Sequence, residues 1–183
     1  MQNWKDLYLE IADKLAEIEG IKWVDLWHNQ ITFLDDEHEF PTPAIFLAFR
    51  TIATEDAGQK LQTIRLQVEA YLYYETFADT YKDSVNQDSA LAFLEHLNSI
   101  YAKLHATTGD NYSEMRRTGF NPVDTGGAGN LYLTMFECNL VDAAAFVEYE
   151  QSEELEVTPE KPDEPLPDAE PQETGLPEFV IPD

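Results

Sequence analysis

Residues 61–75, LQTIRLQVEAYLYYE, place the strongest constraint on the fold, because apolar and polar side chains alternate along them. A period of two is typical of a β-strand with one buried face and one solvated face. Near the end of this segment Tyr71 and Tyr73 replace the polar residues, so aromatic side chains lie on both faces. We expect another part of the chain or another subunit to cover these two tyrosines. The alternative is that they lie on the surface, which tyrosine tolerates.

The remaining periodicities predict two helices and several shorter strands. Residues 3–19 form an apolar stripe at spacings of three and four, followed by Gly20, and residues 88–105 carry a second, broader stripe. The other predicted strands are residues 21–28, 44–51, 112–120 and 131–141. Polar or glycine-rich residues separate these elements and predict loops at 35–43, 54–60, 77–88 and 122–130.

This order of elements predicts an α+β domain. We expect a mainly antiparallel β-sheet with two helices packed on one face, in which residues 44–52 pair with residues 61–75. The domain should cover residues 1–147. Residues 148–183 hold 13 acidic residues, one lysine and most of the prolines, and bury too little apolar surface to offset their ordering entropy, so we expect a disordered acidic tail.

The end of the tail interrupts this composition. The sequence LPEFVI contains four apolar residues, Leu176, Phe179, Val180 and Ile181. Such a peptide can dock on a partner by strand addition. The alternative is a frayed terminus without a partner.

Charge limits the classes of partner. The 183 residues include 36 acidic and 11 basic residues, for a formal net charge of −25. An acidic surface repels phosphate backbones and anionic lipid, so neither specific nucleic-acid binding nor membrane binding is expected. The N-terminal residues lack the pattern of a signal peptide, and no apolar run approaches the ~18–20 residues of a membrane span. We expect a soluble protein of a reducing cytoplasm.

Candidate sites for chemistry are weak. Asp35, Asp36, Glu37, His38 and Glu39 could offer oxygen and nitrogen ligands to a metal, but a solvated loop fits their spacing better. The glycine-rich DTGGAG at 124–129 lacks the lysine of a phosphate-binding loop. Cys138, the single cysteine, is expected to be packed in a strand. The sequence therefore predicts no catalytic residue, no cofactor and no metal site.

Arginines are scarce, which makes their positions informative. Arg50, Arg65, Arg116 and Arg117 could pair with carboxylates across a subunit interface. The alternative is exposed pairs within one chain, worth ~0–1 kcal/mol each. We name Arg50, Arg65, Tyr71 and Tyr73 as the candidate subunit interface.

Five segments resemble one known family. They are MQNWKDLYLEIADKLAEIEGIKWV, PTPAIFLAF, LQVEAYLYYETFADTY, ALAFLEHLNSIYAKL and LYLTMFECNLVD. Together, over residues 3–146, they resemble the tail terminator, or tail completion, proteins of long-tailed bacteriophages. The long segment between Phe77 and Asp88 and the acidic tail depart from that pattern.

The resemblance implies a structural protein of the virion without enzymatic activity. Members assemble as rings, commonly of six subunits, on the end of the tail tube, stop its polymerisation and contact the head connector. DNA would pass such a ring without specific binding. Three alternatives remain: a head–tail connector or neck protein, a small metal-dependent acidic enzyme using residues 35–39, and a host adaptor that binds through LPEFVI.

Overall fold

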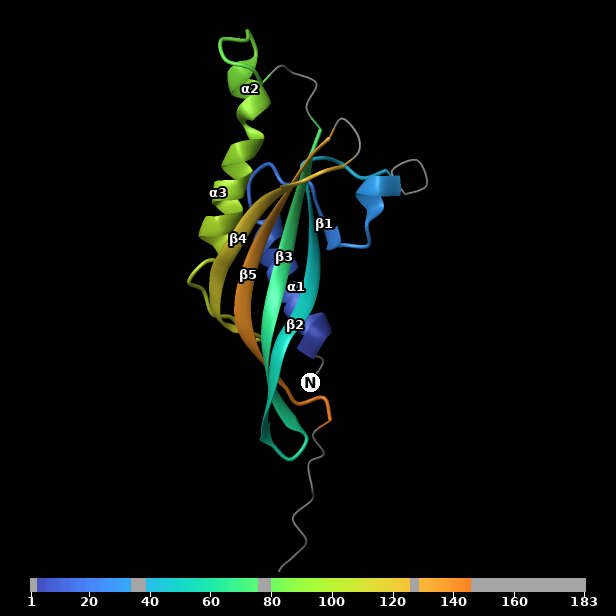
Figure 1. Cartoon of the computed structure of the whole chain (residues 1–183), viewed down its shortest axis with the longest axis vertical. Helices are drawn as coiled ribbons and strands as arrows, with labels where there is room; N and C mark the ends of the chain where they lie inside the picture. Colours follow the sequence, from blue (N-terminus) through green and yellow to red (C-terminus); the bar gives the residue numbers. More distant parts are fainter. Residues whose placement is uncertain (1–2, 34–38, 76–79, 126–128, 146–183) are drawn as a thin grey trace, which may run out of the picture. The chain divides into compact units, whose positions relative to one another are not determined.

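A computed structural model describes residues 3–33, 39–75, 80–125 and 129–145 (Figure 1). The chain divides into two units, Met1–Glu148 and Tyr149–Asp183, and every described residue belongs to the first. The predicted disordered tail, residues 148–183, lies outside the described residues. So does its predicted docking peptide, Leu176, Phe179, Val180 and Ile181.

The first unit is an α+β domain, as the sequence predicts. Its elements are α1 (Asn3–Ala16), β1 (Trp23–Leu26), the 3-10 helix η1 (Gln30–Phe33), β2 (Ala44–Gly58), β3 (Leu61–Tyr74), α2 (Gln87–Leu91), α3 (Phe93–Leu104), β4 (Ser113–Val123) and β5 (Asn130–Asp142). The strands form one sheet in the order β1-β2-β3-β5-β4 (Figure 1). Only the β1–β2 pair is parallel, and the other three pairs are antiparallel.

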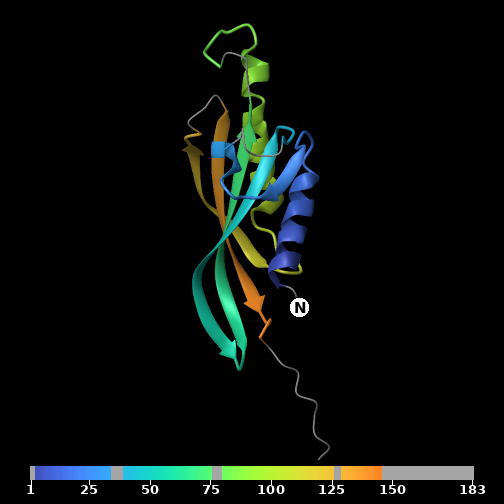
Figure 2. The same cartoon turned by 90° about the vertical axis from the view of Figure 1, so that its right-hand side faces the viewer.

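The core lies between the sheet and the helices α1 and α3, which cover the same face of the sheet (Figure 2). The apolar parity of β3 turns toward the helices, and α1 contributes its stripe from the other side. The buried residues are Leu7, Ile11, Leu15, Ile18, Ile45, Leu47, Ile64, Leu66, Val68, Ala70, Leu72, Ile100, Leu104, Tyr112, Met115, Phe136, Cys138 and Leu140. Each large aliphatic side chain buried here contributes roughly 1.5–3 kcal/mol.

The connection predicted at residues 54–60 is wrong, because β2 continues to Gly58. Only Gln59 and Lys60 join β2 to β3, and Lys60 adopts a positive φ of 61°. Residues 51–60 are all exposed, so both faces of this part of β2 meet solvent. A strand with two wet faces has no apolar alternation, and its polar sequence therefore resembles a loop.

Other boundaries also differ from the sequence-based prediction. The first helix ends at Ala16, and the predicted second helix is broken at Ala92 into α2 and α3. The first strand is limited to Trp23–Leu26. β4 extends through Pro122 into the predicted turn, which agrees with its place at the edge of the sheet, since proline within sheets is found on edge strands.

Candidate functional site

The face of the sheet opposite α1 and α3, named here the open face, carries no α-helix among the described residues (Figure 2). β3 presents to it the second parity of its alternation, which includes Arg65, Gln67, Glu69, Tyr71 and Tyr73. The cross-strand register adds Arg50 from β2 and Glu137 and Arg116 from β5 and β4. The open face therefore carries all four residues of the candidate interface.

The chain itself covers the two tyrosines. Parallel neighbours such as β1 and β2 need a crossover connection, and here residues 27–43 supply it. The connection crosses the open face: Trp27 stacks on Tyr71 with ring centroids 4.2 Å apart, and Phe40 meets the Tyr73 ring edge-on at 5.9 Å. Tyr73 is 2% exposed. The expected cover is thus intramolecular at this end of the sheet.

Local hydrogen bonds fold this connection back on itself. The buried Gln30 side chain donates from Nε2 to the Leu26 carbonyl oxygen (2.9 Å) and accepts at Oε1 from the His28 amide (2.9 Å). Asn29, with φ of 68°, makes the turn between them. Ile31 in η1 is consequently buried in a second apolar cluster with Ala44, Phe46, Tyr73 and Leu131.

Glu69 is the centre of a polar group on the open face. It is only 6% exposed, and its carboxylate accepts hydrogen bonds from the Tyr71 hydroxyl (2.8 Å) and from Gln67 Nε2 (2.9 Å). An Arg50 guanidinium nitrogen lies 3.6 Å from the same carboxylate. Partial burial, together with the hydrogen bond to Glu69, raises the pKa of Tyr71 to about 12.

Tyr73 is held in the same way at the end of β3. Its hydroxyl donates to Glu75 Oε1 at 3.0 Å. Burial and this hydrogen bond raise the pKa of Tyr73 to about 12. Both tyrosines therefore remain protonated donors at neutral pH and are unsuited to act as general bases.

Arg65 forms a cross-strand pair with Glu137. Its Nε donates to Glu137 Oε2 at 3.0 Å, and 59% of the Arg65 side chain is exposed. Both arginines of the candidate interface, Arg50 and Arg65, thus pair with carboxylates of their own chain. The exposed Arg65–Glu137 pair contributes ~0–1 kcal/mol.

Arg116 and Arg117 have different surroundings. Arg117 lies over the Tyr101 ring of α3, 4.0 Å from its centroid, and its amide donates to His105 Nδ1. Arg116 is exposed on the open face, and its side chain forms no ion pair or hydrogen bond with any residue that the structure describes. A shallow groove of about 280 Å³ lies beside it. The groove is lined by Arg65, Glu114, Arg116, Thr118, Glu137, Cys138 and Asn139.

Groups suited to catalysis do not converge in the described ranges. No set of three or more His, Cys, Asp or Glu side chains there could hold a metal ion. Cys138 is packed as expected, and burial raises the pKa of its thiol to about 12. The candidate metal ligands Asp35, Asp36, Glu37 and His38 lie outside the described residues, and Glu39 is exposed. Residues 126–128 of the glycine-rich turn also lie outside the described residues.

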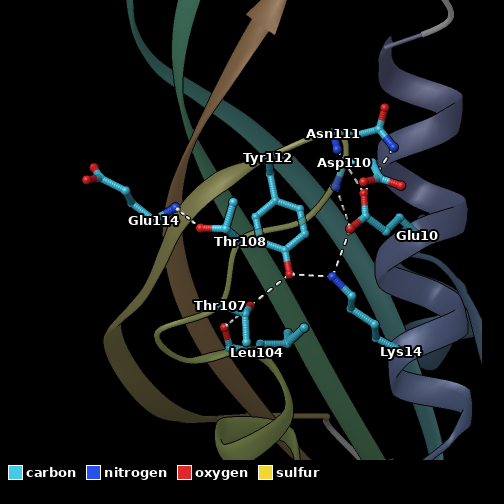
Figure 3. A network of polar contacts seen from close by, with 9 residues as sticks. All are labelled: Glu10, Lys14, Leu104, Thr107, Thr108, Asp110, Asn111, Tyr112 and Glu114. Carbon is cyan, nitrogen blue, oxygen red and sulfur yellow. Dashed lines mark hydrogen bonds and ion pairs between the residues drawn. The ribbon is translucent and has the colours of Figure 1, made fainter.

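A polar network that sequence patterns did not indicate joins α1 to the α3–β4 connection (Figure 3). Glu10 Oε2 accepts from the Asn111 amide and from Asn111 Nδ2, both at 3.0 Å. Lys14 Nζ donates to Glu10 Oε1 (2.8 Å) and to the Tyr112 hydroxyl (2.9 Å). The Tyr112 and Thr107 hydroxyls are also hydrogen-bonded, at 2.8 Å. The network fixes the first helix on the sheet.

The pKa of Glu10 reflects this network. Partial burial alone would raise it, but hydrogen bonds from Lys14 and Asn111 outweigh burial and hold the pKa below its ordinary value. Partial burial would likewise lower the pKa of Lys14, but its bonds to Glu10 and Tyr112 raise it. Both groups stay charged at neutral pH, which makes this a structural ion pair.

No protein-family model matches this chain, and no curated protein matches it significantly. In the part of the chain that the structure describes, no helix combines the length and apolar character of a membrane crossing.

Proposed function

We propose that this chain is a non-enzymatic structural subunit of a bacteriophage virion, which forms a ring on the end of the tail tube, commonly of six copies. The ring would end tube polymerisation and form the joint to the head connector. The observation that carries this proposal is the one-sided sheet, whose two edges are different strands. A surface with two unlike edges favours head-to-tail contacts, and such contacts generate rings when the rotation closes.

The open face supports the same proposal. Trp27, Ile31 and Phe40 cover the aromatic end of this face, while the end that carries Arg50 and Arg65 has no layer over it among the described residues. A neighbouring subunit or the tail tube would provide that layer. The resemblance of residues 3–146 to tail terminators agrees with an assembly of this kind.

The acidic charge suits a channel for DNA. With a net charge of −25, a ring of such subunits repels phosphate groups instead of binding them. DNA could therefore pass without sticking to the wall. The partners would be other copies of the chain, the tail tube protein and the head-connector or neck proteins. The place of action would be the host cytoplasm during assembly and then the end of the tail in the virion.

Light scattering of the purified protein at low and moderate salt is the first test. The proposal expects a mass near six times 20.9 kDa, with a central hole in negative-stain images. The second test adds the protein to polymerising tube protein, where it should shorten the tubes and be found at their ends. A chain that neither forms a ring alone nor changes tube length contradicts the proposal. Co-purification with portal or adaptor protein instead of tube protein would assign it to the neck.

A further inference from the structure

The sheet ends in two strands that each have a partner on one side only. β1 pairs with Ala44–Leu47 of β2, so from Ala48 to Gly58 no described strand lies on that side of β2. At the other edge, β4 pairs with β5 alone. Such edges present unpaired backbone N–H and C=O groups, which are a template for another strand.

The β2–β3 hairpin makes the first edge unusually accessible. Figures 1 and 2 show its tip extending beyond the end of α1, away from the layer of helices. All residues from 50 to 60 are exposed, including Ile52 at 42%. This part of β2 therefore gains no stability from packing against the hydrophobic core of its own chain. A long exposed edge of this kind is normally blunted or covered by a partner.

Two unpaired charges of opposite sign lie on the two edges. Glu55 on β2 and Arg116 on β4 are both exposed, and neither side chain has an ion pair or hydrogen bond to any described residue. In a chain with 36 acidic and 11 basic residues, an arginine without a carboxylate partner is unexpected. The strand registers place Glu55 opposite Thr63, and Arg116 opposite Glu137 and hence level with Gln67. Thr63 and Gln67 belong to the same parity of β3, so both charges project from the open face.

We propose that the outer edge of β2, Ala48–Gly58, adds to the β4 edge, Ser113–Val123, of a second copy of this chain, with Glu55 paired to Arg116 of that copy. β2 and β4 run in opposite directions within the sheet, so copies in the same orientation meet as antiparallel strands. The pair would then lie on one face of a sheet that continues between copies. Opposite charges across neighbouring strands stabilise such a pairing.

The register also specifies how neighbouring copies are displaced. Thr63 and Gln67 are four residues apart on β3, so pairing Glu55 with Arg116 shifts one copy along the strands by about 13 Å at ~3.3 Å per residue. A stagger between strands is what a sheet needs when it closes on itself, because its strands tilt from the axis. This inference deepens the proposed ring and rests on it.

Charge exchange tests the pair. Glu55→Arg and Arg116→Glu should each raise the dissociation constant of the oligomer about tenfold or more, because each places like charges opposite one another. The double variant restores the attraction and should return the oligomer mass in light scattering. Glu19→Arg makes the same charge change as Glu55→Arg, at an exposed residue after α1, and should leave the mass unchanged. Single variants that assemble normally, or a double variant that is no better than either, overturn the pair.

Crosslinking tests the strand addition independently of charge. Thr54→Cys on β2 and Thr118→Cys on β4 introduce exposed thiols, whereas the native Cys138 is buried. With a short bis-maleimide, each single variant should remain uncrosslinked, an equal mixture of the two should give dimers only, and the double variant should give a ladder that ends at the closed ring. Dimers from either single variant indicate contacts between like edges and overturn the inference.

The two experiments separate this inference from the proposed function. A ring that forms without β2–β4 crosslinks removes the inference and leaves the ring. A ladder of crosslinked copies that does not change tube length leaves the inference and removes the role in tube termination. A wild-type chain that stays monomeric at its highest soluble concentration, together with a double-cysteine variant that gives no crosslink, removes the inference.

Discussion

The Trp27 ring lies flat on the Tyr71 ring, with centroids 4.2 Å apart and planes inclined by 10°. This contact joins the start of the β1–β2 crossover to the middle strand of the sheet. It explains why a strand with aromatic residues on both faces can exist in a sheet with helices on one side. Described residues of the crossover that a parallel strand pair requires thus cover one end of the face that the helices leave open.

Replacing Trp27 should therefore destabilise the domain. Trp27→Ala removes the stack on Tyr71 and the edge-on contact with Phe46, and we expect a loss of about 1.5–3 kcal/mol in the free energy of unfolding. Urea denaturation followed by circular dichroism measures it. Trp23→Ala is the matched control, because Trp23 is 40% exposed on β1 and should cost less than about 1 kcal/mol. Equal losses in both variants would contradict a structural role for the stack.

The order of elements could be predicted from the sequence, because an element that is buried on one side has apolar residues at regular spacings. The alternation in residues 61–75 and the stripes of the helices are such traces. The outer half of β2 leaves none, because both of its faces are exposed from Thr51 to Gly58. The break at Ala92 leaves none either, since alanine is the best helix former.

The candidate site could be predicted only in part, for a similar reason. Tyr71 and Tyr73 indicate that a cover is needed. The sequence does not show that Trp27 and Phe40 provide it, since Trp27 lies at the end of a predicted strand and Phe40 in a predicted loop. The scarcity of arginine drew attention to Arg50, Arg65 and Arg116. The strand register decides that Arg50 and Arg65 pair within the chain and that the Arg116 side chain does not. A sequence pattern does not determine this register.

The Glu10 network should make stability depend on pH in the acidic range. The pKa of Glu10 is lowered from 4.5 in the folded chain, so its contribution is fully present above pH 4.5 and is lost as the pH falls through the folded pKa. Glu10→Gln should cost about 1–3 kcal/mol at pH 7, and the deficit should shrink toward pH 3. Urea unfolding at several pH values measures the difference. The exposed Glu19→Gln is the control, and a Glu10→Gln deficit that does not change with pH would contradict the prediction.

Gly109 allows the close approach on which that network depends. A Cβ at this position would overlap the Glu10 carboxylate and lie 2.8 Å from Tyr112 Cε1. Gly109→Ala should therefore displace Glu10 and cost about 1–3 kcal/mol in the free energy of unfolding. Gly58→Ala is the matched control, since its Cβ would meet only the Leu61 Cβ, at 4.0 Å. If thermal or urea unfolding finds Gly109→Ala as stable as Gly58→Ala, the described approach of α1 is wrong.

Cys138 should be inert in the folded chain. Burial raises its thiol pKa from 9.0 to about 12, which lowers the thiolate fraction at pH 8 about a thousandfold, and the side chain is only 3% exposed. A thiol reagent such as Ellman's reagent should label one cysteine in urea and almost none in buffer. Rapid labelling in buffer would show that β5 opens, and Cys138 would then have to be replaced before any crosslinking.

Arg65 tests whether the open face is packed in the assembly. In the single chain its pair with Glu137 is exposed, so Arg65→Glu should cost about 1 kcal/mol or less and leave the circular dichroism spectrum unchanged. If the open face contacts a neighbour, the same change should reduce the oligomer mass.

Lys103→Glu is the control, because Lys103 pairs with Glu17 between the two helices, on the other side of the sheet. Both variants add the same negative charge to a chain that is already at −25, so general self-repulsion would weaken assembly equally in both. Only a loss of mass confined to Arg65→Glu supports a contact at the open face, and an equal loss in both variants would assign the effect to net charge.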